Sequence, residues 1–116
     1  MDIKIIRDSI TKSELADIAS GGFGDMVKAV VDIENGIMAI GGELHADEEA
    51  VLTEQCGSKR EDVWGINLYP KKEGKDWVEF DSMINLKPQH GNRSRGVEDQ
   101  KIREKIVEVV DKLVRN

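Results

Sequence analysis

The sequence predicts a single α+β domain over residues 1–116, a two-layer sandwich with a mostly antiparallel sheet of four to five strands and helices packed mainly on one face. Three observations carry this prediction. Asn35 and Gly36 separate two β-rich runs, a charged turn separates two alternating segments further on, and an apolar helical stripe closes the chain. A chain of 116 residues can bury one core without disulfides or a structural metal.

Charge and composition exclude several classes of protein. Asp and Glu (23) outnumber Lys and Arg (17), and the net charge of -6 opposes the phosphate contacts of nucleic-acid binding. The single Cys56 has no partner for an internal disulfide, and no apolar run reaches the length of a membrane helix or a secretory signal. We therefore expect a cytoplasmic protein that binds neither nucleic acid nor membranes.

The N-terminal part predicts a short strand and a helix. Residues 3–6 (IKII) are short and mostly apolar, which indicates a first strand or a tail packed beside one. Thr11 and Glu14 have the spacing of a capping box, which predicts a helix near residues 12–20. The glycines of residues 21–24 follow a helix and enter a strand, the reverse of the order in phosphate-binding loops, so they predict a turn.

The first hairpin joins residues 27–33 to residues 37–44. Asn-Gly is the strongest short-range hairpin signal, because both turn positions tolerate positive φ. Gly41 lies inside the second run, where a glycine marks a bulge or the close approach of another group.

A segment rich in potential ligands follows this hairpin. It contains Glu43, His45 and Asp47, and it predicts a short helix near residues 47–56 that Asp47 caps and Gly57 ends. Acidic residues at a helix start suit the helix dipole, and no metal-binding motif matches their spacing. His45 stands out because it lies two residues after Glu43 and can share its face.

The second hairpin spans residues 63–87 and has one polar face. Asp81 and Asn85 lie on that face together with Asn67, although Asp and Asn are disfavoured in strands without a local use. A break of the last strand near Ser82 would separate Asn85 from Asp81.

A polar loop then leads into the last helix, predicted near residues 99–115. The loop carries Arg93 and Arg95 between glycines, and the free amides of the following helix start favour anions. The helix has one apolar stripe: Ile102, Ile106, Val109, Val110 and Leu113.

Placed in one sheet, the two hairpins gather glycines and short polar side chains on the face away from the helices. We expect that face to stay partly open and to form one concave site with the arginine loop. Its predicted residues are Glu43, His45, Asn67, Asp81, Asn85, Arg93 and Arg95. Glu43 or His45 is expected within about one side chain's reach of Asp81 or Arg95.

The leading functional hypothesis is the binding of a small anionic or phosphorylated ligand. Arg93 and Arg95 would clamp the anion, and Asn67 and Asn85 would supply neutral hydrogen bonds. The alternative for both arginines is pairing with this chain's own excess acids.

Two further hypotheses belong to other classes. One is a metal-assisted hydrolase that holds a divalent ion with Glu43, His45 and Asp81, although no motif identifies a cofactor. The other is a homodimeric interaction module without catalysis. Its anchors would be Tyr69, Trp77 and Met83.

Four segments resemble a family of small bacterial and archaeal proteins of unknown function. They are residues 41–47 (GGELHAD), 64–70 (WGINLYP), 79–85 (EFDSMIN) and 91–99 (GNRSRGVED). The similarity spans most of the chain. It implies a prokaryotic, cytoplasmic, stand-alone domain, and because the family has no assigned activity it transfers no functional residue.

Overall fold

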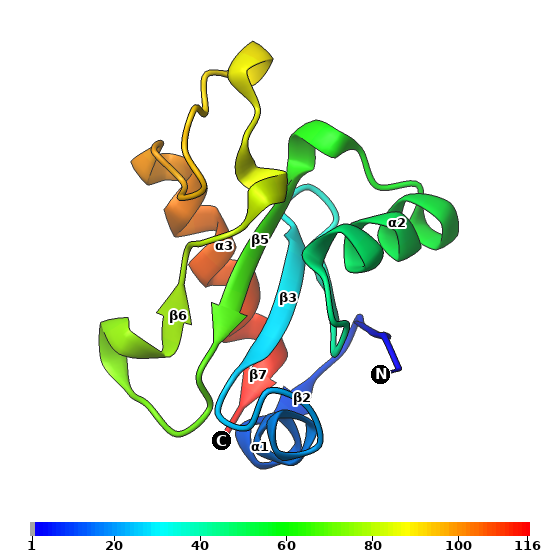
Figure 1. Ribbon diagram of the computed structural model, residues 1–116, viewed down its shortest axis with the longest axis vertical. Helices are drawn as coiled ribbons and strands as arrows, with labels where there is room; N and C mark the ends of the chain where they lie inside the picture. Colours follow the sequence, from blue (N-terminus) through cyan, green and yellow to red (C-terminus); the bar gives the residue numbers. More distant parts are fainter. Residues whose placement is uncertain (1) are drawn as a thin grey trace.

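A five-stranded antiparallel sheet forms the centre of the computed structural model, which describes residues 2–116 (Figure 1). The strand order is β1 (Lys4–Ile6), β4 (Ile37–Ile40), β3 (Val27–Asp32), β5 (Val63–Leu68) and β6 (Val78–Glu79). A separate two-stranded parallel pair joins β2 (Ile10–Thr11) to β7 (Val114–Arg115). The predicted α+β class is confirmed.

The helices lie on both faces of this sheet. α1 (Lys12–Ser20) and α3 (Gln100–Leu113) share one hydrophobic core with the inward side chains of β3, β4 and β5. α2 (His45–Cys56) packs on the opposite face, where Leu52 contacts a smaller cluster that includes Val30 and Val63. The face expected to stay partly open is therefore covered in part by α2. Within residues 2–116, no helix is long and apolar enough to cross a membrane.

Local signals account for α1 and the first hairpin. The capping box is present, with the Glu14 amide donating to Thr11 Oγ1 at 3.0 Å and the Thr11 amide donating to Glu14 Oε1 at 3.1 Å. β3 and β4 pair around the Asn-Gly turn, where Gly36 has a φ of 67°. The carboxylate of Asp32 accepts the amides of Glu34 and Asn35 and fixes that turn.

α2 begins two residues earlier than predicted, and Asp47 is not its cap. The N-cap is Leu44, whose side chain makes no capping hydrogen bond. The helix start is held by Glu48, whose Oε2 accepts the Gly42 amide at 2.8 Å, so a carboxyl in the first turn does the anchoring. The predicted end at Gly57 is confirmed, with a left-handed φ of 68°.

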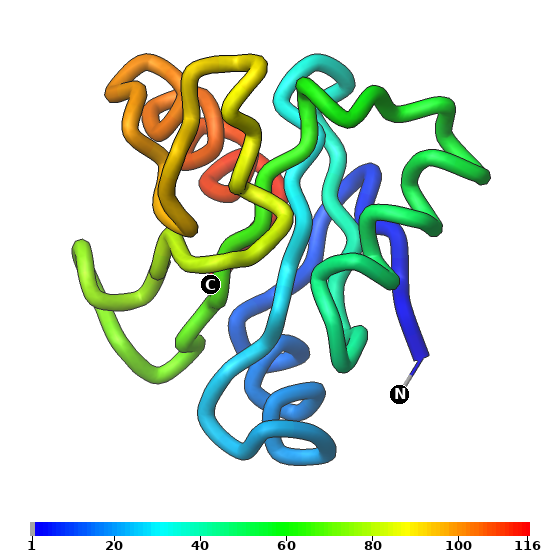
Figure 2. The backbone as a smooth tube through the Cα atoms, turned by 45° about the horizontal axis from the view of Figure 1, so that its top comes forward, coloured from blue at the N-terminus to red at the C-terminus, as the bar shows by residue number. Residues whose placement is uncertain are grey.

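The second hairpin is shorter than predicted, because β6 pairs with β5 only at Glu79 and Val78. After Glu79 the chain leaves the sheet and continues in irregular turns, with short 3-10 helices at Met83–Asn85 and Pro88–His90. These residues fold back beside β5, in yellow in Figures 1 and 2. Asn85 thereby leaves the row of Asp81, as expected from a break near Ser82.

Side chains complete the outer edge of β5 where β6 ends. The Gly65 amide donates to Asn85 Oδ1 at 2.8 Å, and Asn85 Nδ2 donates to the Gly65 carbonyl at 2.9 Å. The buried Lys87 donates its ammonium to the Val63 carbonyl. A carboxamide and an ammonium thus satisfy backbone groups that a longer β6 would have paired.

Candidate functional site

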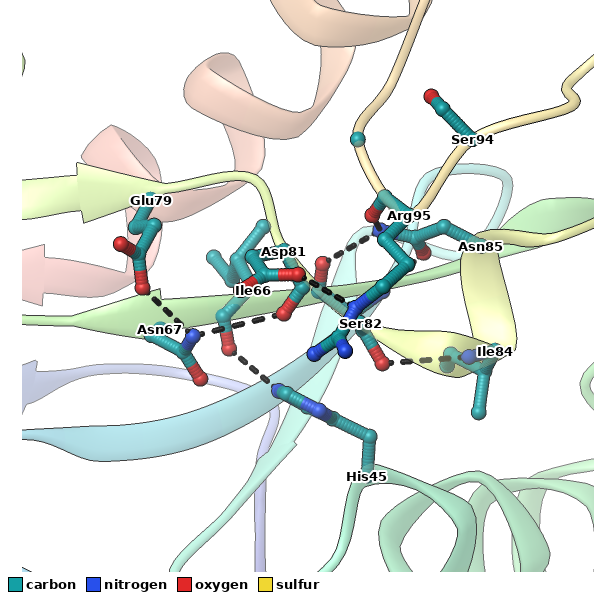
Figure 3. Close-up of polar contacts among 12 residues, drawn as sticks. His45, Ile66, Asn67, Glu79, Asp81, Ser82, Ile84, Asn85, Ser94 and Arg95 are labelled. Carbon is teal, nitrogen blue, oxygen red and sulfur yellow. Dashed lines mark hydrogen bonds and ion pairs between the residues drawn. The ribbon is translucent and has the colours of Figure 1, made fainter.

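Five polar side chains gather at the start of α2, and we call them the His45 cluster: Lys28, His45, Asn67, Asp81 and Arg95. Lys28 on β3 stands opposite Asn67 on β5, and His45 is the first residue of α2. The segment after β6 supplies Asp81, and the loop before α3 supplies Arg95. Figure 3 shows the imidazole, the carboxamide and the guanidinium on the same side of β5.

His45 is 7% exposed and is fixed by the main chain of β5. Its Nε2 lies 2.8 Å from the carbonyl oxygen of Ile66, and because a carbonyl only accepts, Nε2 carries the proton. Burial lowers the pKa of His45, while the Ile66 hydrogen bond and the charge of Asp81 oppose that shift. The imidazole is therefore neutral at pH 7, and its Nδ1 is a hydrogen-bond acceptor.

Asn67 is buried with one half of its carboxamide unused. Nδ2 donates to Glu79 Oε1 at 2.8 Å and to the Asp81 carbonyl at 3.4 Å. Oδ1 is buried and makes no hydrogen bond of normal geometry among residues 2–116, but it faces the His45 imidazole closely enough to raise the pKa of that imidazole. Glu79 also accepts the Tyr69 hydroxyl at 3.1 Å, and burial followed by this carboxylate raises the pKa of Tyr69. An unpaired buried acceptor costs free energy and is suited to a donor brought by a ligand.

Arg95 uses only part of its guanidinium within the chain. Its Nε donates to Asp81 Oδ1 at 2.8 Å, and the two side chains are 57% and 45% exposed. Neither amino group of the guanidinium has a hydrogen bond within the described part of the chain. An exposed pair of this kind contributes at most about 1 kcal/mol, so the arginine is available to an external anion.

The backbone of Arg95 is held more firmly than its side chain. Its carbonyl accepts both Asn85 Nδ2 at 2.9 Å and the Ser82 amide at 3.0 Å. Asn85 is fully buried, and its carboxamide binds backbone groups of Gly65 and Arg95. Of the predicted site residues, Asn85 therefore positions the loop instead of facing a ligand.

Two other predicted site residues lie outside the cluster. Glu43 is exposed, and no hydrogen bond joins its carboxylate to residues 2–116. Arg93 is exposed, and its backbone amide donates to Glu98 Oε2 at 2.7 Å. Arg93 contributes no side-chain contact to the His45 cluster.

Sequence reasoning missed Lys28 and Glu48. Glu48 is fully buried, Oε1 has no partner within residues 2–116, and burial raises its pKa to about 9. The ammonium of Lys28 lies 5.3 Å from the centroid of the Phe23 ring, and its charge lowers the pKa of both His45 and Glu48. The spacing of His45 and Glu48, one helical turn apart, was the available signal for the carboxyl.

The metal-site and dimer hypotheses find different degrees of support. Over residues 2–116, no three His, Cys, Asp or Glu side chains come together to hold a metal ion, so Glu43, His45 and Asp81 form no ligand set. Of the expected dimer anchors, Met83 is 62% exposed and Trp77 is 8% exposed. Tyr69 is half-buried and bound to Glu79. The homodimer stays a prediction for light scattering.

Comparison with known proteins gives one match. The profile of a family described as "Protein of unknown function (DUF5674)" matches residues 4–113. No curated protein and no solved structure matches the chain.

Proposed function

The chain belongs to the DUF5674 family of proteins of unknown function, and we propose that it binds a small anionic ligand at the His45 cluster. Because the family has no assigned activity, this proposal rests on the side chains of this protein alone. The observation that carries the proposal is the guanidinium of Arg95, which binds Asp81 through Nε alone and leaves both amino groups unused. Such groups bind a carboxylate or phosphate in bidentate fashion.

The start of α2 adds to the favourable field for an anion. Leu44 provides no side-chain cap, but its carbonyl accepts the Asp47 amide at 3.1 Å, so the first two amides of the helix, those of His45 and Ala46, are the ones without an acceptor within residues 2–116. Glu48 is protonated at pH 7 because burial raises its pKa to about 9, and it therefore adds no negative charge to this helix end, whereas Asp47, the other acid of the first turn, weakens the field for an anion. The positive charge of Lys28 acts on the same end, where it lowers the pKa of both His45 and Glu48. The positive end of a helix dipole together with Lys and Arg is a common anion site.

The ligand should also donate a hydrogen bond. Asn67 Oδ1 is a buried acceptor that makes no hydrogen bond of normal geometry within residues 2–116, and the Nδ1 atom of the neutral His45 is a second acceptor. An anion that carries a hydroxyl or a protonated oxygen fits both kinds of group. Inorganic phosphate, phosphate monoesters and small hydroxy acids have this chemistry.

The test compares two arginines of one loop. Purified wild-type protein, Arg95→Ala and Arg93→Ala are melted at low ionic strength with inorganic phosphate, phosphate monoesters and hydroxy acids. Both variants lose one positive charge, but only Arg95→Ala removes a member of the His45 cluster. At a ligand concentration of about 100 times Kd, we expect roughly 2.7 kcal/mol of stabilisation, or roughly 10 °C, in the wild type and Arg93→Ala.

The result that supports the proposal is loss of this shift in Arg95→Ala alone. Two results overturn it: no anion stabilises the wild type, or Arg95→Ala is stabilised as strongly as the wild type. The melts are then repeated at high salt, which screens the general attraction between exposed charges. A ligand-induced shift in melting temperature that persists at high salt indicates a specific site.

A further inference from the structure

A groove with a volume of about 920 Å³ runs between β6 and α3, away from the His45 cluster. Trp77, Val78 and Phe80 line one wall, and Arg103 and Val107 line the other. Both elements are labelled in Figure 1, where β6 lies to the left of α3. The volume lies within the range of about 300–1,000 Å³ that small-molecule sites occupy.

The groove has an apolar surface that the core leaves uncovered. Val78 and Phe80 are half-buried, and Val107 is 36% exposed although it lies on the mostly charged side of α3. Trp77 belongs to the core and is only 8% exposed at the groove, and the ammonium of Lys12 lies 4.6 Å from its ring centroid. Aromatic and aliphatic side chains of this kind bind the apolar body of a ligand.

A cation within the groove lacks an acceptor. The Nε of Arg103 is buried and has no hydrogen-bond partner among residues 2–116. A buried donor on a charged group costs free energy unless an acceptor reaches it, and an anionic acceptor satisfies it best. Three acids and three cations line the groove, so its lining carries no net charge and offers no excess of cations for a second negative charge on the ligand: Glu104, Glu108 and Asp111 against Lys12, Lys75 and Arg103.

We propose that this groove binds a small amphipathic monoanion, an organic acid whose apolar body rests on Val78, Phe80 and Val107 and whose carboxylate pairs with Arg103. This site is separate from the His45 cluster, so the test of this proposal is independent of the test of the proposed function.

A free acid fits the groove better than an extended peptide. The Tyr69 amide donates a hydrogen bond to the Trp77 carbonyl, and Glu79 stands opposite Asn67. Because hydrogen-bonded and non-hydrogen-bonded pairs alternate in an antiparallel ladder, the backbone N–H and C=O of Val78 point away from β5. The next backbone group that would point outward is the Phe80 carbonyl. It is covered by Gly96, since a Cβ added to Gly96 would lie 3.5 Å from the Phe80 carbonyl oxygen. A peptide strand would therefore find one residue to pair with.

The experiment measures octanoate binding to the full chain by isothermal titration calorimetry. Octanoate is compared with octanamide, which has the same apolar body without the charge. Arg103→Gln removes the proposed partner of the carboxylate, and Lys101→Gln removes an exposed positive charge of α3 that does not line the groove. Val107→Glu places a negative charge on the apolar wall without altering Arg103.

We expect octanoate to bind the wild type and Lys101→Gln alike, and to bind Arg103→Gln and Val107→Glu about tenfold or more weakly. Octanamide should bind the wild type as weakly as octanoate binds Arg103→Gln. The proposal is overturned if the wild type does not bind octanoate, if octanamide binds equally well, or if Arg103→Gln or Val107→Glu retains wild-type affinity. Thermal melts of each variant establish that it is folded, and Arg95→Ala should bind octanoate normally.

Discussion

The buried carboxyl of Glu48 gives the protein a stability that depends on pH in an unusual direction. Burial raises its pKa from 4.5 to about 9, so between these values the folded chain holds a proton that the unfolded chain has lost. The free energy of unfolding must then fall as the pH rises through this window. The unfolding free energy changes by about 1.4 kcal/mol per pH unit in this window, so through Glu48 it is roughly 3 kcal/mol lower at neutral pH than at acid pH.

Replacing Glu48 with Gln removes this dependence. Gln keeps an acceptor for the Gly42 amide but does not titrate. We expect the difference in unfolding free energy between Glu48→Gln and the wild type to shift by about 1.4 kcal/mol per pH unit in favour of the variant, from about pH 5 to pH 8. Because both proteins share every other titrating group, the difference isolates this carboxyl.

Urea unfolding followed by circular dichroism at four pH values in that window measures the effect. Glu54→Gln is the matched control, since Glu54 is an exposed acid of the same helix. Its difference from the wild type should stay constant with pH. If the curves of Glu48→Gln and the wild type run parallel instead, Glu48 is ionised in the folded protein and the assignment of its protonation is wrong.

Three further predictions concern other buried groups. Burial lowers the pKa of Lys87 from 10.5 to about 8, so the unfolding free energy of the wild type should rise by roughly 3 kcal/mol in total as the pH rises through this range. The unfolding free energy of Lys87→Met should not rise in this way. Urea unfolding that shows an equal gain in the variant would contradict this prediction. An added Cβ at Gly65 would lie 2.5 Å from Ser82 Oγ, so Gly65→Ala should cost about 1–3 kcal/mol, and adding Ser82→Gly should recover part of it. A double-mutant cycle without coupling would refute that contact. Because burial lowers the pKa of His45 below 6.5, acidification below this value should destabilise the wild type more than His45→Gln, and equal losses of melting temperature in both would argue against a neutral imidazole.

Local sequence signals predicted the elements that depend on local physics. The capping box of Thr11 and Glu14, the Asn-Gly turn and the apolar stripe of α3 each involve residues within a few positions of one another. Their geometry follows from hydrogen bonding and periodicity inside the segment, so no knowledge of the remaining chain was required.

The rest of the fold depends on contacts that are distant in sequence. β6 ends early because Asn85 reaches Gly65, 20 positions away, and pairs with it as a strand residue would. α2 docks through His45 and Glu48 as well as Leu52, so its packing face lacks the apolar stripe that periodicity detects. Lys28 joins the site only through the register of β3 with β5, which the sequence does not specify.

Asn85 has a consequence for how the arginine loop moves. The same amide nitrogen donates to the carbonyls of Gly65 and Arg95, so it ties the loop to the outer edge of the sheet, and the loop cannot swing away without breaking the hydrogen bonds that the Arg95 carbonyl accepts from Asn85 and from the Ser82 amide. The backbone of Arg95 is therefore preorganised, and only its side chain has rotamers to lose when an anion arrives. Ordering one long side chain costs about 0.5–1.5 kcal/mol, far less than ordering a flexible loop. Hydrogen exchange at the Ser82 amide would report the opening of this loop, because that amide donates to the Arg95 carbonyl.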